Sequence, residues 1–266
     1  MNRIKNKFLE LKEKNKNALI TFITANDPNF QISNKLLQRL PSFGADIIEI
    51  GLPFSDPMAD GPVIQKSSLR AIKSKFCLEK TFKSIKSFRH TNDKTPIILM
   101  GYFNTFFQFG LKKIFVYSKK FGVDGFIIVD LPPEEYQLID ALQKQYKIDI
   151  IRLITPTTDK NRVKIILKNA TGFLYYVSIL GITGTKIPSL EKVKKHISMI
   201  KKKTDLPIAI GFGIKEKSQV YEISKFAEGS VVGSSLVRIV EKYSKDEEKM
   251  FKEIELFLKT LRNDYI

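Results

Sequence analysis

Residues 46–62 read DIIEIGLPFSDPMADGP, an apolar run followed by a loop rich in proline and glycine. The run predicts a buried β-strand, because it is rich in isoleucine and ends at a glycine. Glu49 lies within the run, and Asp56 and Asp60 follow in the loop beyond the strand's carboxyl end. A carboxylate that points from a strand into an apolar interior is costly unless it is paired or protonated. The stretch therefore indicates an enzyme that uses carboxyl groups for acid–base chemistry.

The same unit of strand, loop and helix recurs along the whole chain of 266 residues. Short runs rich in Ile, Val, Phe and Tyr, bounded by Gly, Pro, Asp or Asn, predict buried parallel strands. These strands are expected at 18–24, 46–50, 96–102, 125–129, 149–154, 173–177, 207–211 and 229–232. Amphipathic stretches predict helices at 32–43, 62–73, 78–89, 111–121, 133–145, 162–169, 190–203, 217–226 and 247–261.

Eight such units without a linker-like tract predict an α/β fold, a single (β/α)8 TIM barrel that forms one domain over residues 1–266. An open, doubly wound sheet is the alternative, although no G-x-G-x-x-G motif opens the first helix. An additional helix is expected at 4–14, where Ile4, Phe8 and Leu11 share one face that covers the bottom of the barrel. Functional residues of such a barrel lie at the carboxyl ends of the strands and in the loops that follow.

The chain is strongly basic, with 45 Lys and Arg against 28 Asp and Glu and a formal charge of +17. The lysines recur on nearly every predicted helix and accompany no nucleic-acid-binding motif, so solvated helix faces explain them better than nucleic acid does. Cys77 is the only cysteine, and His90 and His196 are the only histidines, which argues against disulfides and against a metal site built from these residues. No signal peptide and no apolar run of about 20 residues is found, so a cytoplasmic protein without membrane contact is expected.

Two sets of residues could carry the chemistry. If Glu49 points into the barrel, loss of solvation raises its pKa and lets it exchange a proton near neutrality, whereas an outward Glu49 would pair with a surface lysine. Asp60 is either its partner or simply a turn residue.

The glycine-rich turns 211–213 and 233–235 follow the last two strands, and each precedes a helix. Backbone N–H groups at a helix N-terminus bind phosphate, and Gly184 could add another N–H. The loop 178–188, with two glycines and two threonines, suits a lid over the substrate or is an ordinary surface loop.

With these residues identified, the chain closely resembles the α subunits of tryptophan synthase over nearly its whole length. The most specific match is the run from Glu49 to Gln65 and the Arg70-Ala71 that follows it. Further matches cover 24–28, 99–104, 124–133, 178–184 and 211–214. The resemblance implies a lyase of tryptophan biosynthesis that cleaves indole-3-glycerol phosphate into indole and glyceraldehyde 3-phosphate. It also implies an α2β2 complex in which indole passes to a β subunit, which alone carries pyridoxal phosphate; no cofactor and no metal is expected in this chain.

The resemblance also assigns roles to individual residues. Glu49 is expected to be the acid–base residue and Asp60 its ionised partner. Thr183, on the lid, is expected to meet Asp60, and Tyr175 to line the site. Indole contacts are expected from Phe22, Met100, Tyr102, Ile127 and Phe212. Phosphate contacts are expected from Gly184, Gly213, Gly233, Ser234 and Ser235. An exposed apolar patch for the β subunit is expected to include Pro53, Phe54, Asp56, Asn104, Phe107 and Pro132.

The chain departs from the family pattern at a few positions. Asn26 replaces a usual glycine, but asparagine tolerates positive φ, so the turn is expected to survive. Ile179 and Lys186 stand where arginine is common, and Ser235 stands where alanine is usual, which leaves open which serine contacts phosphate. Other phosphate-binding barrels, such as sugar-phosphate isomerases, are the rival enzymes, and a basic binding protein without catalysis is the rival outside enzymes.

Overall fold

The computed structural model describes residues 2–178, 190–211 and 213–262. Their strands form one sheet of nine parallel strands in the order β5-β4-β3-β2-β1-β9-β8-β7-β6. The strands are β1 (Ala18–Thr24), β2 (Ile47–Gly51), β3 (Ile97–Gly101), β4 (Gly125–Ile128), β5 (Asp149–Ile150), β6 (Arg152–Ile154), β7 (Leu174–Val177), β8 (Ile208–Gly211) and β9 (Gly229–Val232). The first strand pairs with the last, so the sheet curls into a barrel.

The barrel is completed by the segment 149–154, which the sequence predicts as one strand. The structure divides it at Ile151: β5 pairs with β4, and β6 pairs with β7. The two ends of the strand order are therefore neighbours in the chain, and the backbone N–H of Ile151 still donates to Phe126 at 2.9 Å. The predicted (β/α)8 barrel is confirmed, and the division reflects a change of pairing partner along one strand.

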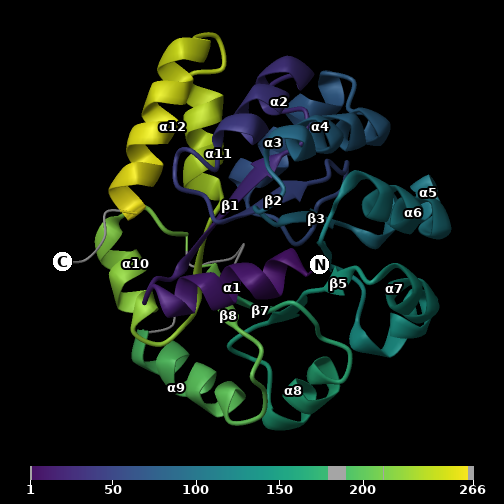
Figure 1. The fold of residues 1–266 in the computed structure, drawn as a ribbon, viewed down its shortest axis with the longest axis vertical. Helices are drawn as coiled ribbons and strands as arrows, with labels where there is room; N and C mark the ends of the chain where they lie inside the picture. The colour runs from purple at the N-terminus through teal and green to yellow at the C-terminus, as the bar shows by residue number, and fades with distance from the viewer. Residues whose placement is uncertain (1, 179–189, 212, 263–266) are drawn as a thin grey trace.

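Helices surround this barrel, as Figure 1 shows. They are α2 (Phe30–Arg39), α3 (Pro62–Lys73), α4 (Leu78–Thr91), α5 (Phe103–Phe109), α6 (Leu111–Phe121), α7 (Asp140–Tyr146), α8 (Lys160–Leu167), α9 (Leu190–Lys201), α10 (Lys217–Ser224), α11 (Ser234–Lys242) and α12 (Glu247–Arg262), with a 3-10 helix η1 (Pro133–Leu138). One helix was predicted over 133–145, but the buried Ile139 has φ −126°, outside the helical range, and separates η1 from α7. Helix α5 was not predicted; its Phe106 is buried edge-on against Phe126 of β4, with ring centroids 5.2 Å apart.

Side chains inside the barrel form their own apolar cluster. Ile20, Ile47, Ile98 and Ile127 come from four neighbouring strands and are fully buried there. The additional helix α1 (Arg3–Glu13) adds Ile4, Phe8 and Leu11 to the same cluster. Figure 1 shows α1 lying across one end of the barrel, which confirms the expected cover. The opposite end, where the strands terminate, is left for the functional loops.

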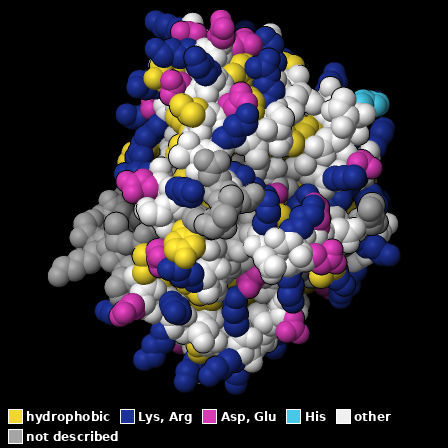
Figure 2. Space-filling model, turned by 60° about the vertical axis from the view of Figure 1, so that its left-hand side comes forward, with side chains coloured by type: hydrophobic (Ala, Val, Ile, Leu, Met, Phe, Trp, Pro, Cys, Tyr) yellow, Lys and Arg dark blue, Asp and Glu magenta, His cyan; other side chains and the backbone are white. Residues whose placement is uncertain are grey.

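Charged side chains are distributed over the surface. On the face shown in Figure 2, Lys and Arg side chains lie dispersed, with Asp and Glu between them. Within the described residues, no helix is both long and apolar enough to cross a bilayer. The same residues contain no group of three or more metal-ligating side chains.

Candidate active site

Glu49 lies near the end of β2 and points into the barrel. Its neighbours in register are Phe22 on β1 and Ile98 on β3. The side chain is 0% exposed, and neither carboxyl oxygen has a hydrogen-bond partner among the described residues. Burial raises the pKa of Glu49 to about 8, because water no longer solvates the charged form. The alternative of an outward Glu49 paired with a surface lysine is therefore wrong, and the group is predominantly neutral at pH 7.

Asp60 stands on the loop after β2, directly before α3. The Tyr102 hydroxyl donates to Asp60 Oδ2 at 3.1 Å and accepts from the N–H of Ala59 at 2.9 Å. Gln65 Nε2 donates to the Asp60 carbonyl at 2.9 Å, which fixes the loop to α3. Burial raises the pKa of Asp60 to about 6, and the hydrogen bond from Tyr102 opposes this rise. The same barrel end thus holds one carboxyl that is neutral at pH 7 and one that is ionised.

Glu49 and Asp60 both act electrostatically on the hydroxyl group of Tyr175. Burial raises the pKa of the Tyr175 hydroxyl well above its usual value, and the charges of Glu49 and then Asp60 raise it further. The ring extends from β7 over Gly211, where an added Cβ would lie 2.8 Å from the Tyr175 hydroxyl oxygen. Glycine at 211 is therefore required for the tyrosine to lie here.

Phe22 lies over a second glycine in the same way. A Cβ at Gly51 would lie 2.3 Å from the end of the Phe22 ring, so a side chain cannot be placed there. Phe22, Asp60, Met100 and Tyr102 line one small cavity at the carboxyl ends of β1, β2 and β3. Ile127 belongs to the apolar cluster below, against which Met100 packs. The site is thus a small cavity with Asp60 and several apolar side chains in its wall.

One of the residues expected to contact phosphate, Gly233, lies beside this cavity. Gly233 immediately precedes α11, and a Cβ there would meet the Phe22 side chain at 3.4 Å. Gly213 has φ +62°, a conformation that favours glycine. The Ser235 hydroxyl donates to the Ile214 carbonyl at 2.6 Å, so this side chain is already engaged. Ser234 is partly exposed at the first position of α11, where backbone N–H groups lack helical acceptors and attract anions.

Three of the expected site residues, Thr183, Gly184 and Phe212, lie outside the described residues, as do Ile179 and Lys186. The first residue of the predicted lid is described. Ser178 donates from both its N–H and its hydroxyl to the Gly211 carbonyl, at 3.1 and 2.7 Å.

The residues expected to face a partner are arranged around the same end of the barrel. Phe107 is 58% exposed, and Asp56, Asn104 and Pro132 are also exposed. Phe54 is half-buried and stacks on Tyr102, with ring centroids 5.1 Å apart. Pro53 is buried, so the expectation that it belongs to an exposed patch is wrong: the chain reaches the surface only at Ser55, two residues further along.

The sequence did not predict a network of charged side chains that joins the loop after β1 to α3 and α11. Arg70 of α3 donates from Nε and Nη2 to the two oxygens of Asp27, at 2.8 and 2.9 Å, and from Nη1 to Glu241 of α11 at 3.0 Å. Asn26 has φ +66°, as the turn requires, and its amide donates to the Ala71 carbonyl at 3.2 Å. These bonds hold together the loop after β1, the helix α3 that follows the Asp60 loop, and the helix α11. One feature of the sequence pointed to the residues of this network: segments 24–28 and 70–71 resemble the corresponding segments of the family.

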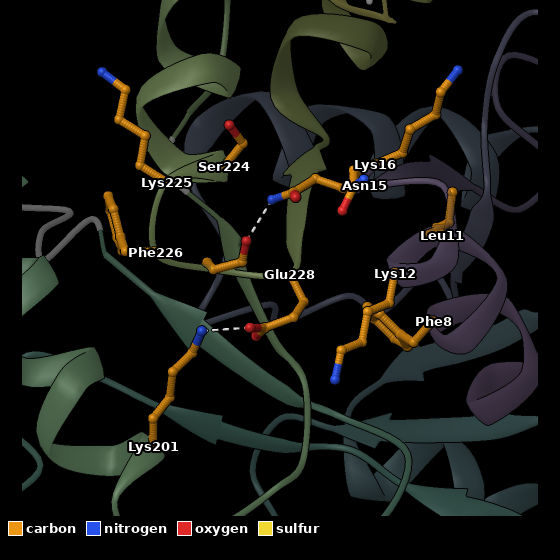
Figure 3. A pocket seen from close by; sticks show the side chains of 12 residues that line it. Phe8, Leu11, Lys12, Asn15, Lys16, Lys201, Ser224, Lys225, Phe226 and Glu228 are labelled. Carbon is orange, nitrogen blue, oxygen red and sulfur yellow. Dashed lines mark hydrogen bonds and ion pairs between the residues drawn. The ribbon is translucent and has the colours of Figure 1, made fainter.

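Larger cavities open at the other end of the barrel, under α1. Figure 3 shows one of them, with Lys201 and Glu228 pointing toward each other as an ion pair. The second Glu228 oxygen accepts the Ile208 N–H at 2.8 Å. Both oxygens of the Glu228 carboxylate therefore have partners within the chain. In barrels of this type, this end contributes stability and the opposite end carries the chemistry.

The comparisons with known proteins agree with this geometry. The family model for the tryptophan synthase alpha chain matches residues 8–265. The chain belongs to the tryptophan synthase alpha chain family. Tryptophan synthase subunit alpha from Legionella pneumophila is 33% identical, with a TM-score of 0.90, and covers 98% of this chain and 97% of its own. A tryptophan synthase complex from Pyrococcus furiosus is 34% identical, with a TM-score of 0.83, and covers 93% of this chain and 98% of the compared one. The match to an enzyme family is consistent with a barrel end that holds a buried acid.

Proposed function

We propose that the chain cleaves indole-3-glycerol phosphate into indole and glyceraldehyde 3-phosphate. The observation that carries the proposal is Glu49, a fully buried carboxyl that has no hydrogen-bond partner in the described part of the chain and whose pKa is raised to about 8. The cleaved bond joins indole C3 to a glycerol carbon, so C3 must take up a proton before the bond can break. A carboxylic acid that is neutral at pH 7 in an apolar cavity supplies that proton.

The second carboxyl stabilises the charge that this proton transfer creates. Protonation at C3 leaves an indolenium cation with positive charge near the ring nitrogen. Asp60 is ionised at pH 7, since its pKa is about 6, and it offers a fixed negative charge in a site largely shielded from water. Glu49, now a carboxylate, takes the proton of the neighbouring glycerol hydroxyl. The C–C bond breaks, its electron pair restores the indole ring, the aldehyde forms, and Glu49 is protonated again.

The phosphate is proposed to lie at the N-terminus of α11 and the turn at Gly213. We assign the hydroxyl contact to Ser234, since the Ser235 hydroxyl already donates to the Ile214 carbonyl. Phe22 lies between Gly51 and Gly233, so the ring cavity and the phosphate end are adjacent, as one substrate requires. Residues 1–266 are proposed to act as one domain.

We also propose that the chain works with a tryptophan synthase β subunit, which would hold the pyridoxal phosphate and receive the indole. The exposed Asn104 and Phe107 lie on α5, which follows β3, and Pro132 lies in the loop after β4. All three are at the same end as the site, so a partner docked there would cover the cavity. The matched Pyrococcus furiosus structure is a tryptophan synthase complex.

The proposal is tested by incubating the purified chain with indole-3-glycerol phosphate and measuring indole, with and without a β subunit. Slow release by the chain alone and faster release in the complex are expected. The absence of indole from both reactions, with a folded chain, contradicts the proposed function.

A further inference from the structure

Arg70 joins the two helices that begin at the two ends of the proposed site. Asp60 lies two residues before α3, and Ser234 is the first residue of α11. Figure 1 shows these two helices side by side, and they are in contact. Arg70, in the last turn of α3, donates from Nη1 to Glu241 of α11 at 3.0 Å. The ion pair therefore connects the helix that follows the proposed acid to the helix assigned to the phosphate.

The same guanidinium also holds the loop after β1. Nε and Nη2 of Arg70 donate to the two oxygens of Asp27, at 2.8 and 2.9 Å, and Asp27 is 3% exposed. Three nitrogens of one side chain thus bind two carboxylates from distant parts of the sequence. Pairing of this two-pronged kind fixes an orientation as well as a distance. A lysine has a single ammonium group and cannot reproduce that geometry.

Further bonds attach α3 to the end of β1. The hydroxyl oxygens of Thr24 and Ser67 lie 2.6 Å apart, within hydrogen-bond distance. The amide of Asn26 donates to the Ala71 carbonyl at 3.2 Å, near the end of the helix. With these bonds, α3 is fixed to β1, and so is the loop that carries Asp60.

The helix α11 meets the same framework near both of its ends. At its start, a Cβ at Gly233 would lie 3.4 Å from the Phe22 side chain of β1. In its last turn, Glu241 accepts from Arg70. The Arg70 side chain is 24% exposed and that of Glu241 is 41% exposed. An ion pair exposed to this degree contributes little to the free energy of unfolding, so we expect its effect in the placement of α11.

We propose that Arg70 is a positioning residue: by holding Glu241, it sets the distance between the phosphate end of α11 and the Asp60 loop. The inference rests on the proposed function, because that proposal places the indole ring beside Asp60 and the phosphate at Ser234. A small displacement between two binding points weakens a ligand that spans both, although each point still binds its own fragment. Arg70 acts through the two helices and not through contact with the substrate.

The test compares KM and kcat for indole-3-glycerol phosphate in Glu241→Ala, which releases α11 from Arg70 and leaves the Asp27 pair in place. Alanine favours the helix, so α11 itself is preserved. KM is expected to rise about threefold to fivefold, as befits a partly exposed ion pair, while kcat changes by less than about twofold. Glu241→Gln, whose amide oxygen still accepts from Arg70, should restore most of the wild-type KM.

Glu255→Ala is the matched control. The Glu255 side chain is 40% exposed, against 41% for Glu241, and it pairs with Lys259 of the same helix, α12. Its KM should equal that of the wild type, and thermal unfolding should show all three variants to be folded. A wild-type KM in folded Glu241→Ala, or an equal rise of KM in Glu255→Ala, would overturn the inference.

Inorganic phosphate, used as a competitive inhibitor, distinguishes placement of the phosphate site from damage to it. Its inhibition constant should be the same in the wild type and in Glu241→Ala, because the N-terminus of α11 is unchanged. An inhibition constant that rises as much as KM would assign the effect to the phosphate site itself and would overturn the inference.

A double-mutant cycle tests whether Arg70 and Glu241 act as one unit. Arg70→Lys should raise KM at least as far as Glu241→Ala does, and adding Glu241→Ala to it should raise KM no further. Independent, additive effects of the two substitutions would contradict the inference. A wild type that releases no indole contradicts the proposed function and this inference with it, whereas a wild-type KM in Glu241→Ala contradicts only the inference.

Discussion

Asp124 and Asp46 at the N-terminal end of the barrel and Glu49 at the C-terminal end are buried carboxyl groups in opposite situations. At the N-terminal end, Asp124 receives bonds from Arg3 at 2.9 Å and Arg89 at 2.8 Å, and Asp46 receives two from Arg262, at 2.5 and 3.0 Å. At the C-terminal end, Glu49 has no hydrogen-bond partner among the described residues. The chain has 45 Lys and Arg residues, so composition does not explain why the described residues place none of them in an ion pair with Glu49. The two aspartates are neutralised by arginines, as Asp27 is by Arg70 at the end that holds Glu49, whereas Glu49 stays protonated, as its proposed role requires.

The largest expected effect is on catalysis by Glu49→Gln. The amide cannot give or accept the proton at indole C3 or at the glycerol hydroxyl, so kcat for indole release should fall by about 10³–10⁴-fold. Steady-state indole release measures it, with the Asp124→Asn variant as a control from the other end of the barrel. More than a tenth of wild-type activity in Glu49→Gln would remove Glu49 from its proposed role.

The same two substitutions are expected to change stability in opposite directions. Asp124→Asn leaves two arginines without their counter-charge and should cost about 3–5 kcal/mol. The pKa of Glu49 is about 8 in the folded protein, against an ordinary value of 4.5. The protonated form therefore contributes its full stability below pH 4.5, and this contribution is lost as the pH rises through 8. Glu49→Gln should therefore match the wild type near pH 4 and exceed it at pH 8, in denaturant unfolding measured at both pH values. Destabilisation by both substitutions at pH 8 would contradict the contrast between the two ends.

Much of this contrast could be predicted from the sequence, because its signals are local. The strands followed from apolar runs bounded by glycine and proline, and Glu49 was recognised because a carboxyl interrupted one of them. The division at Ile151 could not be predicted, since it depends on which neighbour each half of the strand pairs with. Helix α5 was missed because 103–109 is short, and four of its seven residues are phenylalanines, so its apolar residues are not confined to one helical face. The bond from Tyr102 to Asp60 joins residues 42 positions apart and has no signal in either segment.

A smaller effect is expected from Ser234→Ala, which should raise KM for indole-3-glycerol phosphate by about tenfold and change kcat little. Ser235→Ala should leave KM closer to the wild type and instead lower stability by about 1 kcal/mol, through the lost bond to Ile214. Kinetics and thermal unfolding of both variants distinguish the two serines. The reverse assignment, with KM raised only in Ser235→Ala, would place the phosphate hydroxyl contact at Ser235.

The smallest change is expected from Tyr102→Phe. In the wild type, kcat/KM should rise with ionisation of Asp60 near pH 6 and fall with ionisation of Glu49 near pH 8. The Tyr102 hydrogen bond lowers the pKa of Asp60, so its loss should move the acidic limb to higher pH and reduce the rate at pH 7 by a few-fold. An acidic limb that stays in place would show that Asp60 does not set it.

The most direct test of the central claim is infrared spectroscopy of the protonated carboxyl of Glu49 across the pH range. The account predicts a carboxylic-acid band at pH 7 that is absent from Glu49→Gln and disappears with a midpoint near pH 8. Disappearance of that band by pH 5 would show that Glu49 is ionised at neutral pH, and the proposed proton donor would not exist.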